Sequence, residues 1–365
     1  MKAVVLILDL TGDCNLRCEY CYASGGENQD CLSVDDAVLA IEKTYEKYEC
    51  IVQTLFHGGE PMMCFEQICK IITMVKKKSY AKFVHWTIQT NGTLLTDEAV
   101  SYFAKNAVGV AISVDGATNI SNATRPFEDQ KPSTEKTLAC FDILKRYNLP
   151  IHILSVINKH NYKSYPQDME NFIEMGATVF SSNPLIAAGR GAQTKIGIDT
   201  NELFELYKKI TDVIIKYYNK NMRIFEKNIY HIVKQIVTEK PSYMCMAQPC
   251  GAGLAQVTIS PKGLVYPCAD FIGEDSFCLG NVKEDFFSNF TTNKKWLEIR
   301  QYSLDQFEKC TSCEIKNFCP AGCAVRCYFH NGKISSIDPL CDFYFKFISY
   351  LKEKDWASKL YALWN

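Results

Sequence analysis

The residues of this chain best suited to chemistry are its cysteines, and they are unevenly distributed along the sequence. Of eighteen cysteines in 365 residues, three form a CxxxCxxC pattern within residues 14–21, and ten fall within residues 245–341. None lies in residues 141–244. A chain of this length does not need disulfide staples, and thiolates that stay reduced are available to bind metal. We therefore interpret the two groups as two sets of metal ligands.

Composition and charge exclude several classes of protein. Forty basic and forty-one acidic residues give a net charge of −1, so we expect no nucleic-acid partner, because holding phosphates takes a strongly basic surface. There is no run of about 18 apolar residues, so we expect no membrane span. Residues 1–10 do not form a signal peptide, because their apolar stretch is too short and an acidic residue follows it too early. We expect a cytoplasmic protein with reduced thiols.

Strand-like and helix-like segments alternate through the first 190 residues. Short apolar runs predict six strands and stretches of helical spacing predict helices between them, with Ser33 as a candidate N-cap. The strands are 3–10, 51–56, 83–89, 108–114, 151–157 and 177–181, and the helices are 34–47, 66–77, one starting near 96, 134–147 and 165–174. This α/β pattern predicts a parallel sheet with right-handed crossovers, either a barrel or an open doubly wound sheet.

The composition changes along the chain and predicts four segments. They are an α/β domain in 1–195, a helical connection in 196–244 with helices at 202–220 and 227–238, a cysteine-rich domain in 245–345 and a short helix in 346–365. Regular periodicity is weak in the cysteine-rich segment. We expect something other than packing to hold it, and metal is the obvious candidate.

The first cysteine group directly follows the first predicted strand. Three thiolates on one short loop can hold three irons of a cubane cluster and leave the fourth iron open, much as catalytic zinc sites keep one open position. The alternative is a zinc knuckle, which needs a fourth ligand such as Cys31 or His57. Barrel enzymes keep their chemistry at the carboxyl ends of their strands, which favours the catalytic interpretation.

With Tyr20 just before its last cysteine, the motif resembles that of the radical S-adenosylmethionine (SAM) enzymes. Four further segments match in the family's order, each ending a predicted strand: Gly58-Gly59-Glu60-Pro61, Thr90-Asn91-Gly92, Ser113-Val114-Asp115-Gly116 and Asn183-Pro184-Leu185. Alone, several of these are ordinary turn sequences, so their joint order carries the signal. The resemblance implies a partial (β/α)6 TIM-like barrel.

The resemblance also implies a role for each segment. Cys14, Cys18 and Cys21 would ligate a 4Fe–4S cluster. Residues implied to contact SAM are Gly58, Gly59 and Glu60 at its amino group, Ser113 and Asp115 at its ribose and carboxylate, Asn183 near its adenine, and also Asn91. We also expect Arg125 to bind the SAM carboxylate, because guanidinium binds carboxylate bidentately. In this family the reduced cluster cleaves SAM to methionine and a 5′-deoxyadenosyl radical, which takes hydrogen from the substrate.

The second cysteine group resembles the SPASM domain, an extension of peptide- and protein-modifying radical SAM enzymes. Its pattern is Cys250-x12-Gly263-x4-Cys268, Cys310-x2-Cys313-x5-Cys319-x3-Cys323 and Cys341. The resemblance implies two auxiliary 4Fe–4S clusters, and so three clusters in all, ligated by Cys250, Cys268, Cys323 and upstream Cys245, and by Cys310, Cys313, Cys319 and Cys341. The alternative is a pair of zinc-ribbon-like sites. Cys278 and Cys327 are unassigned.

The resemblance implies a polypeptide substrate, for which two sub-families compete. Anaerobic sulfatase maturases carry a tyrosine two residues after the last core cysteine and an aspartate directly after the Tyr-Pro-Cys cysteine. Here Ala23 and Ala269 hold these positions. Asp270 comes one place late, which on an extended chain would turn it elsewhere. Maturases of ribosomally made peptides fit better, and Gly189-Arg190-Gly191 after the sixth strand is typical of them.

We therefore expect a radical SAM/SPASM peptide maturase, an oxidoreductase that introduces a thioether or other crosslink, or a related modification, in a ribosomally made peptide. The chain starts at its first strand, so we expect leader recognition to need a separate protein or another surface of this one. A flavodoxin or ferredoxin would supply electrons. Asp270, Tyr22 and His57 are candidate catalytic residues. Alternatives of other classes are a non-catalytic iron–sulfur electron carrier and a zinc-binding interaction module.

Overall fold

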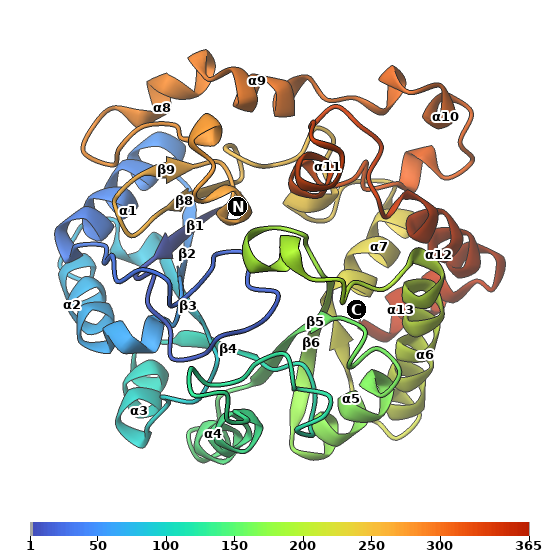
Figure 1. Ribbon diagram of the computed structural model, residues 1–365, viewed down its shortest axis with the longest axis horizontal. Helices are drawn as coiled ribbons and strands as arrows, with labels where there is room; N and C mark the ends of the chain where they lie inside the picture. Colours follow the sequence, from blue (N-terminus) through green and yellow to red (C-terminus); the bar gives the residue numbers. More distant parts are fainter. Residues whose placement is uncertain (1–2, 365) are drawn as a thin grey trace.

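Nine strands form one curved sheet in the computed structural model, which describes residues 3–364 apart from the side chains of residues 286 and 289. Their order is β7-β6-β5-β4-β3-β2-β1-β8-β9, and only β8 and β9 pair antiparallel (Figure 1). The first six are β1 (Ala3–Asp9), β2 (Ile51–His57), β3 (Val84–Thr90), β4 (Val108–Ser113), β5 (Ile151–Ile157) and β6 (Ala177–Pro184). Sequence analysis predicts all six, with β5 at the same bounds.

Five helices lie outside this sheet, one after each of the first five strands (Figure 1). They are α1 (Val34–Tyr48), α2 (Phe65–Val75), α3 (Asp97–Lys105), α4 (Thr134–Arg146) and α5 (Tyr165–Glu174). The predicted cap is confirmed, because the Ser33 side chain accepts from the Asp36 N–H at 3.0 Å. Thr96 caps α3 in the same way through the Ala99 N–H. The repeated crossovers curve the sheet into a partial barrel, as the family resemblance implies.

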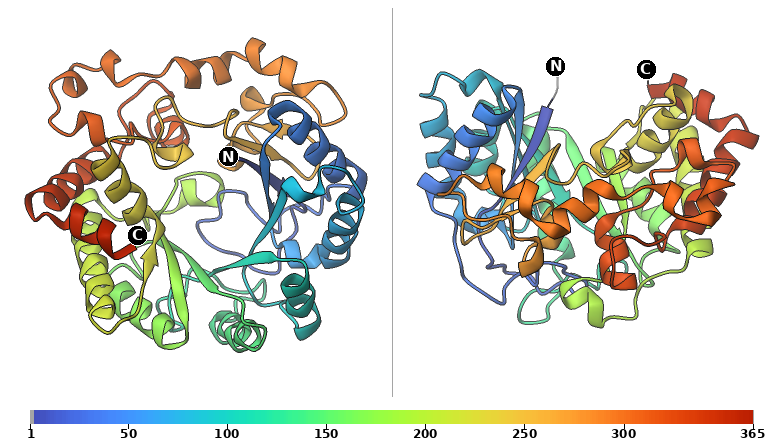
Figure 2. Two further views of the ribbon diagram at one scale, coloured as in Figure 1. Left: turned by 180° about the vertical axis from the view of Figure 1, so that it is seen from behind. Right: turned by 90° about the horizontal axis from the view of Figure 1, so that it is seen from above.

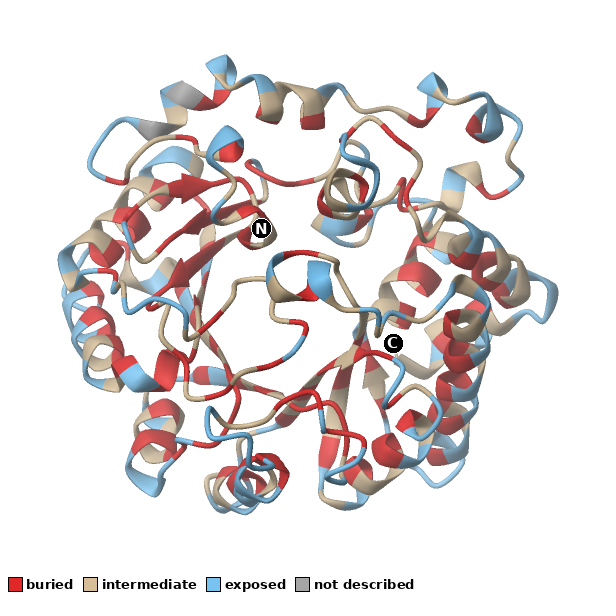
Figure 3. Ribbon diagram, viewed as in Figure 1, coloured by how far each residue is buried: buried red, intermediate tan, exposed pale blue. Residues whose placement is uncertain are grey.

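Alternation along each strand separates the core from the inner face of the barrel. In β1, Val4, Leu6 and Leu8 are at most 1% exposed and pack beneath the helices, whereas Ile7 lines a cavity on the inner face. Each of the next four parallel strands also contributes to the same cavity, with Leu55, Gln89, Ser113 and Leu154 among its lining residues. Figure 3 shows the buried residues concentrated on the strands and on the helix faces toward them.

Two helices cover the β6 side of the sheet. They are α6 (Thr200–Tyr218) and α7 (Lys227–Thr238), with the two-residue β7 (Phe225–Glu226) between them. The predicted bounds of α7 are confirmed. The side-chain carboxylate of Asp199 accepts from the Asn201 and Glu202 N–H groups and so fixes the start of α6.

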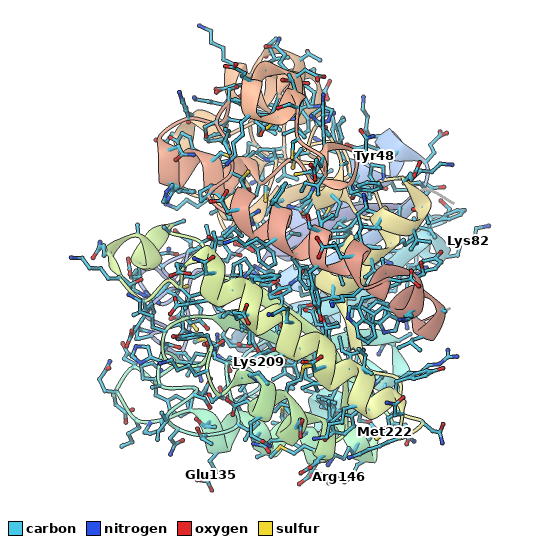
Figure 4. All side chains as sticks on the ribbon, turned by 90° about the vertical axis from the view of Figure 1, so that its right-hand side faces the viewer. Tyr48, Lys82, Glu135, Arg146, Lys209 and Met222 are labelled. Atoms are coloured by element: carbon cyan, nitrogen blue, oxygen red, sulfur yellow. The ribbon has the colours of Figure 1, made fainter. Side chains whose placement is uncertain are left out.

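The C-terminal helix prediction is wrong in its number of helices. The sequence predicts one helix over 346–365, but the structure has α12 (Cys341–Glu353) and α13 (Trp356–Trp364), and Asn365 lies outside the described residues. The chain turns between them at Asp355, whose φ of 53° is left-handed. α12 lies alongside α6 (Figure 4), where the rings of Tyr207 and Phe343 are 4.9 Å apart.

The cysteine-rich segment joins the same sheet. Its β8 (Gln256–Ile259) pairs with β1 and its β9 (Val265–Tyr266) forms the edge. Lys43 on α1 donates to the Val282 carbonyl at 2.8 Å. The remaining helices, α8 (Phe286–Asn289), α9 (Lys294–Gln301), α10 (Glu308–Thr311) and α11 (Ala324–Asn331), span one side of the barrel mouth (Figures 1 and 2).

This segment also has a core of its own, which weak periodicity hid from sequence analysis. The rings of Phe271 and Phe277 stack with centroids 3.7 Å apart, and Ile299, Val325 and Ile334 pack around them. Packing therefore contributes to holding the segment. Among residues 3–364, no helix is long and apolar enough to cross a membrane.

Candidate functional site

A single cavity of about 520 Å³ runs through the inside of the barrel. It begins at the loop of Cys14, Cys18 and Cys21 and passes the carboxyl ends of the strands. It ends at three cysteines of the C-terminal segment: Cys245, Cys268 and Cys323. Its size falls within the range of small-molecule sites, and the strand ends are where barrel enzymes hold their chemistry. The two cysteine groups therefore open onto one space.

The three N-terminal thiols lie at one end of this cavity. The Leu16 N–H donates to the Cys14 sulfur at 3.4 Å and the Gly25 N–H to the Cys21 sulfur at 3.3 Å. Backbone donors of this kind stabilise thiolates and tune iron–sulfur clusters. Three soft sulfur ligands with backbone donors thus fit an iron–sulfur cluster that keeps one iron open.

The zinc alternative fits these residues less well. Of the two candidate fourth ligands, the Cys31 thiol is engaged elsewhere, because it lies 3.5 Å from the Thr11 hydroxyl. Within residues 3–364, no three His, Cys, Asp or Glu side chains converge on a point where one metal ion would fit. A tetrahedral zinc site needs four ligands at about 2.0–2.3 Å from the metal.

Gly58 and Gly59 let the second strand end directly against the cysteine loop. A Cβ on Gly59 would lie 2.0 Å from the Asp13 carbonyl oxygen, and one on Gly58, at a φ of 127°, would lie 2.5 Å from the Thr11 carbonyl. The Glu60 N–H donates to the Asp13 carbonyl at 2.8 Å. The pair therefore serves close backbone approach rather than a simple turn.

The Glu60 carboxylate is buried at the cavity wall. It accepts from the Met62 N–H at 2.9 Å, from the Thr90 hydroxyl at 2.6 Å and from the Asn91 N–H at 2.8 Å. Burial raises the pKa of Glu60, while these hydrogen bonds lower it. A carboxylate offers about four acceptor positions, so one remains for a donor in the cavity.

Tyr20 joins two of the predicted SAM contacts. Its hydroxyl donates to Asp115 at 2.5 Å and accepts from Arg125 Nη1 at 2.8 Å. Asp115 also accepts from Thr124 and the Val156 N–H, is fully buried and is absent from the cavity wall. Arg125 lines the cavity. The structure thus brings Arg125 to the site and sets Asp115 behind Tyr20.

The other predicted contacts lie on the cavity wall. Asn91 donates to Asn15 at 2.9 Å, and its oxygen accepts from Thr93. Asn183 accepts from the Asn228 amide at 3.2 Å, while Ser113 faces the cavity from the end of β4. These polar groups span the mouths of β3, β4 and β6, so together they can surround a ligand with several polar atoms.

The three candidate catalytic residues meet in one corner of the cavity. His57 Nε2 lies 3.4 Å from the Tyr22 hydroxyl, and its Nδ1 lies 2.8 Å from Asp9. Burial lowers the pKa of His57, but the Asp9 carboxylate and Asp270 outweigh it and raise the pKa. Burial raises the pKa of Tyr22 well above its usual value, and Asp270 raises it further. Sequence analysis missed Asp9, although an acid ending an apolar strand was a visible signal.

The expectation that Asp270 turns elsewhere is wrong. The chain is extended only as far as Cys268, and Ala269–Phe271 then forms a 3₁₀ turn. This turn returns the Asp270 carboxylate to within 4.0 Å of the Cys268 sulfur, on the cavity wall. Burial raises the pKa of Asp270 to about 6, against the opposing charges of His57 and Arg326. Arg326, which also lines the cavity, carried no signal in the sequence.

Several C-terminal thiols raise one another's pKa, and these mutual shifts link them in two sets. Burial raises the pKa of Cys323 to about 12, and the nearby thiol of Cys250 adds to the shift. Burial likewise raises the pKa of Cys245, and the thiols of Cys250 and Cys323 add to the shift. In the second set burial raises the pKa of Cys319 to about 12, and three thiols add to it: Cys341, Cys313 and Cys310.

The two unassigned cysteines are tied to backbone carbonyls. The Cys327 thiol donates to the Ser336 carbonyl at 3.4 Å, and the Cys278 thiol donates to the Gly280 carbonyl at 3.6 Å. A thiol that donates keeps its proton, whereas a metal ligand loses it. Both are therefore structural thiols.

Two protein-family models match this chain, and the segments they match contain cysteines of this site. Residues 8–173 match the radical SAM superfamily, and residues 250–314 match the SPASM iron–sulfur cluster-binding domain. The chain thus contains a radical SAM domain followed by a C-terminal SPASM domain. The partial barrel and the cysteine-rich segment described above are these two domains.

Relatives match over most of the chain. A cysteine-type anaerobic sulfatase-maturating enzyme of Clostridium novyi is 27% identical over 349 residues, covering 88% of each chain. An AdoMet-dependent heme synthase of Methanosarcina barkeri is 24% identical over 346 residues, covering 91% of this chain and 94% of that one.

Two solved structures share the fold at 19% identity. Native anSMEcpe with bound AdoMet and Cp18Cys peptide has a TM-score of 0.84, covering 98% of this chain and 99% of its own. Streptococcus suis SuiB bound to precursor peptide SuiA has a TM-score of 0.69, covering 93% and 74%.

Proposed function

We propose that this enzyme is a peptide maturase that takes a hydrogen atom from a ribosomally made peptide and forms a thioether or another crosslink. The observation that carries this proposal is the single cavity between the Cys14–Cys21 loop and the C-terminal cysteines. A space that would receive SAM at one end and one auxiliary cluster at the other leaves room between them for a peptide side chain. Solved structures of the same fold hold such peptides.

In this proposal three 4Fe–4S clusters are held by the three cysteine sets. A cluster held by the first set would supply the one electron needed for reductive cleavage of SAM, the chemistry that yields a hydrogen-abstracting radical. Glu60 would accept a hydrogen bond from the SAM amine and Arg125 would donate to the SAM carboxylate, each with hydrogen-bonding capacity left toward the cavity. The enclosing barrel excludes water from the reacting groups. A flavodoxin or ferredoxin would deliver the electrons, and a separate protein would present the peptide leader.

A second candidate function is formylglycine formation. It is favoured by the position of Asp270, which the 3₁₀ turn carries onto the cavity wall beside Cys268. Tyr22 also lines the cavity, one position before the tyrosine expected from sulfatase maturases. Both side chains that this chemistry uses are thus present, each displaced by one residue in the sequence.

One experiment separates the two candidates. The anaerobically reconstituted enzyme is given SAM, reductant and either the Cp18Cys peptide or cysteine-rich precursor peptides deuterated at the α- and β-carbons. Crosslinking removes two hydrogens from the peptide mass, whereas formylglycine formation also exchanges sulfur for oxygen. In either case deuterium should appear in 5′-deoxyadenosine. Deuterium-free 5′-deoxyadenosine with every peptide would contradict a peptide substrate.

A further inference from the structure

The segment after β6 grips the loop that carries the first three cysteines. Residues 10–33 contain no helix and only isolated bridges, so many of their carbonyl groups need partners from elsewhere. Gly189–Gln193 forms a 3₁₀ turn that lies against this loop. The proposed function gives this turn no task.

Arg190 supplies donors to three carbonyls of the loop. Its Nε donates to the Cys18 carbonyl at 3.0 Å, and both terminal nitrogens donate to the Gly25 carbonyl at 3.1 Å. Its backbone N–H donates to the Cys21 carbonyl at 3.0 Å. One residue therefore fixes the loop at two of the three cysteines and just beyond the last.

The flanking glycines allow this approach. A Cβ on Gly189, at a φ of 53°, would lie 2.2 Å from the Tyr22 carbonyl oxygen. A Cβ on Gly191 would lie 3.0 Å from the Tyr20 carbonyl oxygen. Because the contacts are with backbone, no rotamer change relieves them. The sequence Gly189-Arg190-Gly191 is thus shaped to place one guanidinium against the loop.

Arg190 also brings a positive charge to this end of the cavity. Its side chain is 22% exposed and pairs with Glu27, which is 54% exposed, at 2.8 Å. The guanidinium lines the cavity beside Cys18 and Cys21. Since the more exposed partner is better screened by water, the pair leaves net positive potential on the loop side.

We propose that Arg190 is a positioning residue for the SAM-binding cluster: its guanidinium holds the cysteine loop in shape, and its charge stabilises the reduced cluster. Reduction adds one electron from an external flavodoxin- or ferredoxin-type donor and changes no covalent bond of the chain. A positive charge nearby favours the more negative, reduced form. The inference rests on the proposed function only in taking Cys14, Cys18 and Cys21 as cluster ligands.

The test is an anaerobic redox titration of the full-length, reconstituted protein, followed by EPR, using the signal that changes when SAM is added. For Arg190→Gln we expect the equilibrium constant for one-electron reduction of the cluster to fall about three- to tenfold. A tenfold fall corresponds to a reduction potential that is 59 mV more negative. Glu27→Gln should shift it the opposite way, by less than about threefold, because that carboxylate is better screened. Arg190→Lys should keep the potential but retain less iron. Arg146→Gln, at an exposed arginine paired with Asp97, is the matched control.

Each outcome decides. An R190Q protein that keeps its full iron content and has the reduction potential of the wild type would overturn the inference. If R190Q loses the cluster, the E27Q variant decides alone. A charge effect of Arg190 predicts a more positive reduction potential for E27Q, whereas a purely structural role predicts an unchanged potential. A wild-type protein with no SAM-responsive signal would contradict the proposed function instead.

Discussion

Asp9 and His57 are register partners at the ends of the adjacent strands β1 and β2, and their side chains meet with Nδ1 2.8 Å from Oδ1. Sheet pairing therefore builds this buried pair, with no loop involved. The pair leaves His57 Nε2 toward the cavity, where its contact with the Tyr22 hydroxyl is long, at 3.4 Å. This end of the imidazole is free to meet a ligand.

The Asp9–His57 pair should make stability depend on pH. The folded-state pKa of His57 is raised above 6.5, so the folded protein binds the proton more tightly than the unfolded chain. Stability from the pair is fully present below pH 6.5 and is lost as pH rises through the folded-state pKa. Relative to wild type, His57→Gln should therefore lose more unfolding free energy at pH 6 than at pH 9. Urea titrations at the two pH values measure this, and the exposed His160→Gln should show no such difference.

Gly59 should tolerate no side chain. Gly59→Ala places a Cβ 2.0 Å from the Asp13 carbonyl oxygen, and the required shift moves the cysteine loop. We expect a loss of about 2–4 kcal/mol in unfolding free energy, with reduced iron retention. Gly197→Ala is the matched control, because nothing lies within 4 Å of its Cβ. Equal stability of the two variants would show that the loop adapts freely.

Tyr20 should matter through its hydroxyl. Tyr20→Phe removes the acceptor of Arg125 and a donor to buried Asp115. We expect a cost of about 1–3 kcal/mol in unfolding free energy and weaker SAM binding, since Arg125 loses its anchor. Chemical denaturation and isothermal titration with SAM measure the two effects. Tyr218→Phe, at a tyrosine 40% exposed, should change neither.

Iron content should separate ligands from structural thiols. The reconstituted wild type should hold about twelve irons per chain, as three four-iron clusters require. Cys245→Ser and Cys323→Ser should each lose up to about four irons, whereas Cys327→Ser should lose none, because that thiol donates to the Ser336 carbonyl. A wild-type content near four irons would leave the first cysteine set as the sole cluster site.

Much of the fold could be predicted from the sequence, because the periodicity of apolar residues and the spacing of cysteines are local properties of the chain. β5, α5 and α7 have their predicted bounds, and the CxxxCxxC loop follows β1 as expected. What failed depended on non-local or irregular structure. The pairing of β8 with β1 joins residues about 250 positions apart, and the turn at Ala269–Phe271 that redirects Asp270 has no periodic signal.

The site was likewise predicted in part. Motif residues such as Glu60 and Arg125 do line the cavity, as do the candidates Tyr22, His57 and Asp270. Asp115 is behind Tyr20, which only the packing of the loop against β4 could reveal. Asp9 and Arg326 belong to no motif, so their place in the site follows from register and tertiary packing alone.

The most direct test of the central claim is anaerobic SAM cleavage by the reconstituted protein under dithionite, with 5′-deoxyadenosine measured by mass spectrometry. We predict that 5′-deoxyadenosine accumulates over several turnovers with the wild type. It should stay at background in the variant with Cys14, Cys18 and Cys21 replaced by alanine. An iron-loaded wild type that yields no 5′-deoxyadenosine above that background would contradict the assignment of this cavity as a SAM-cleaving site.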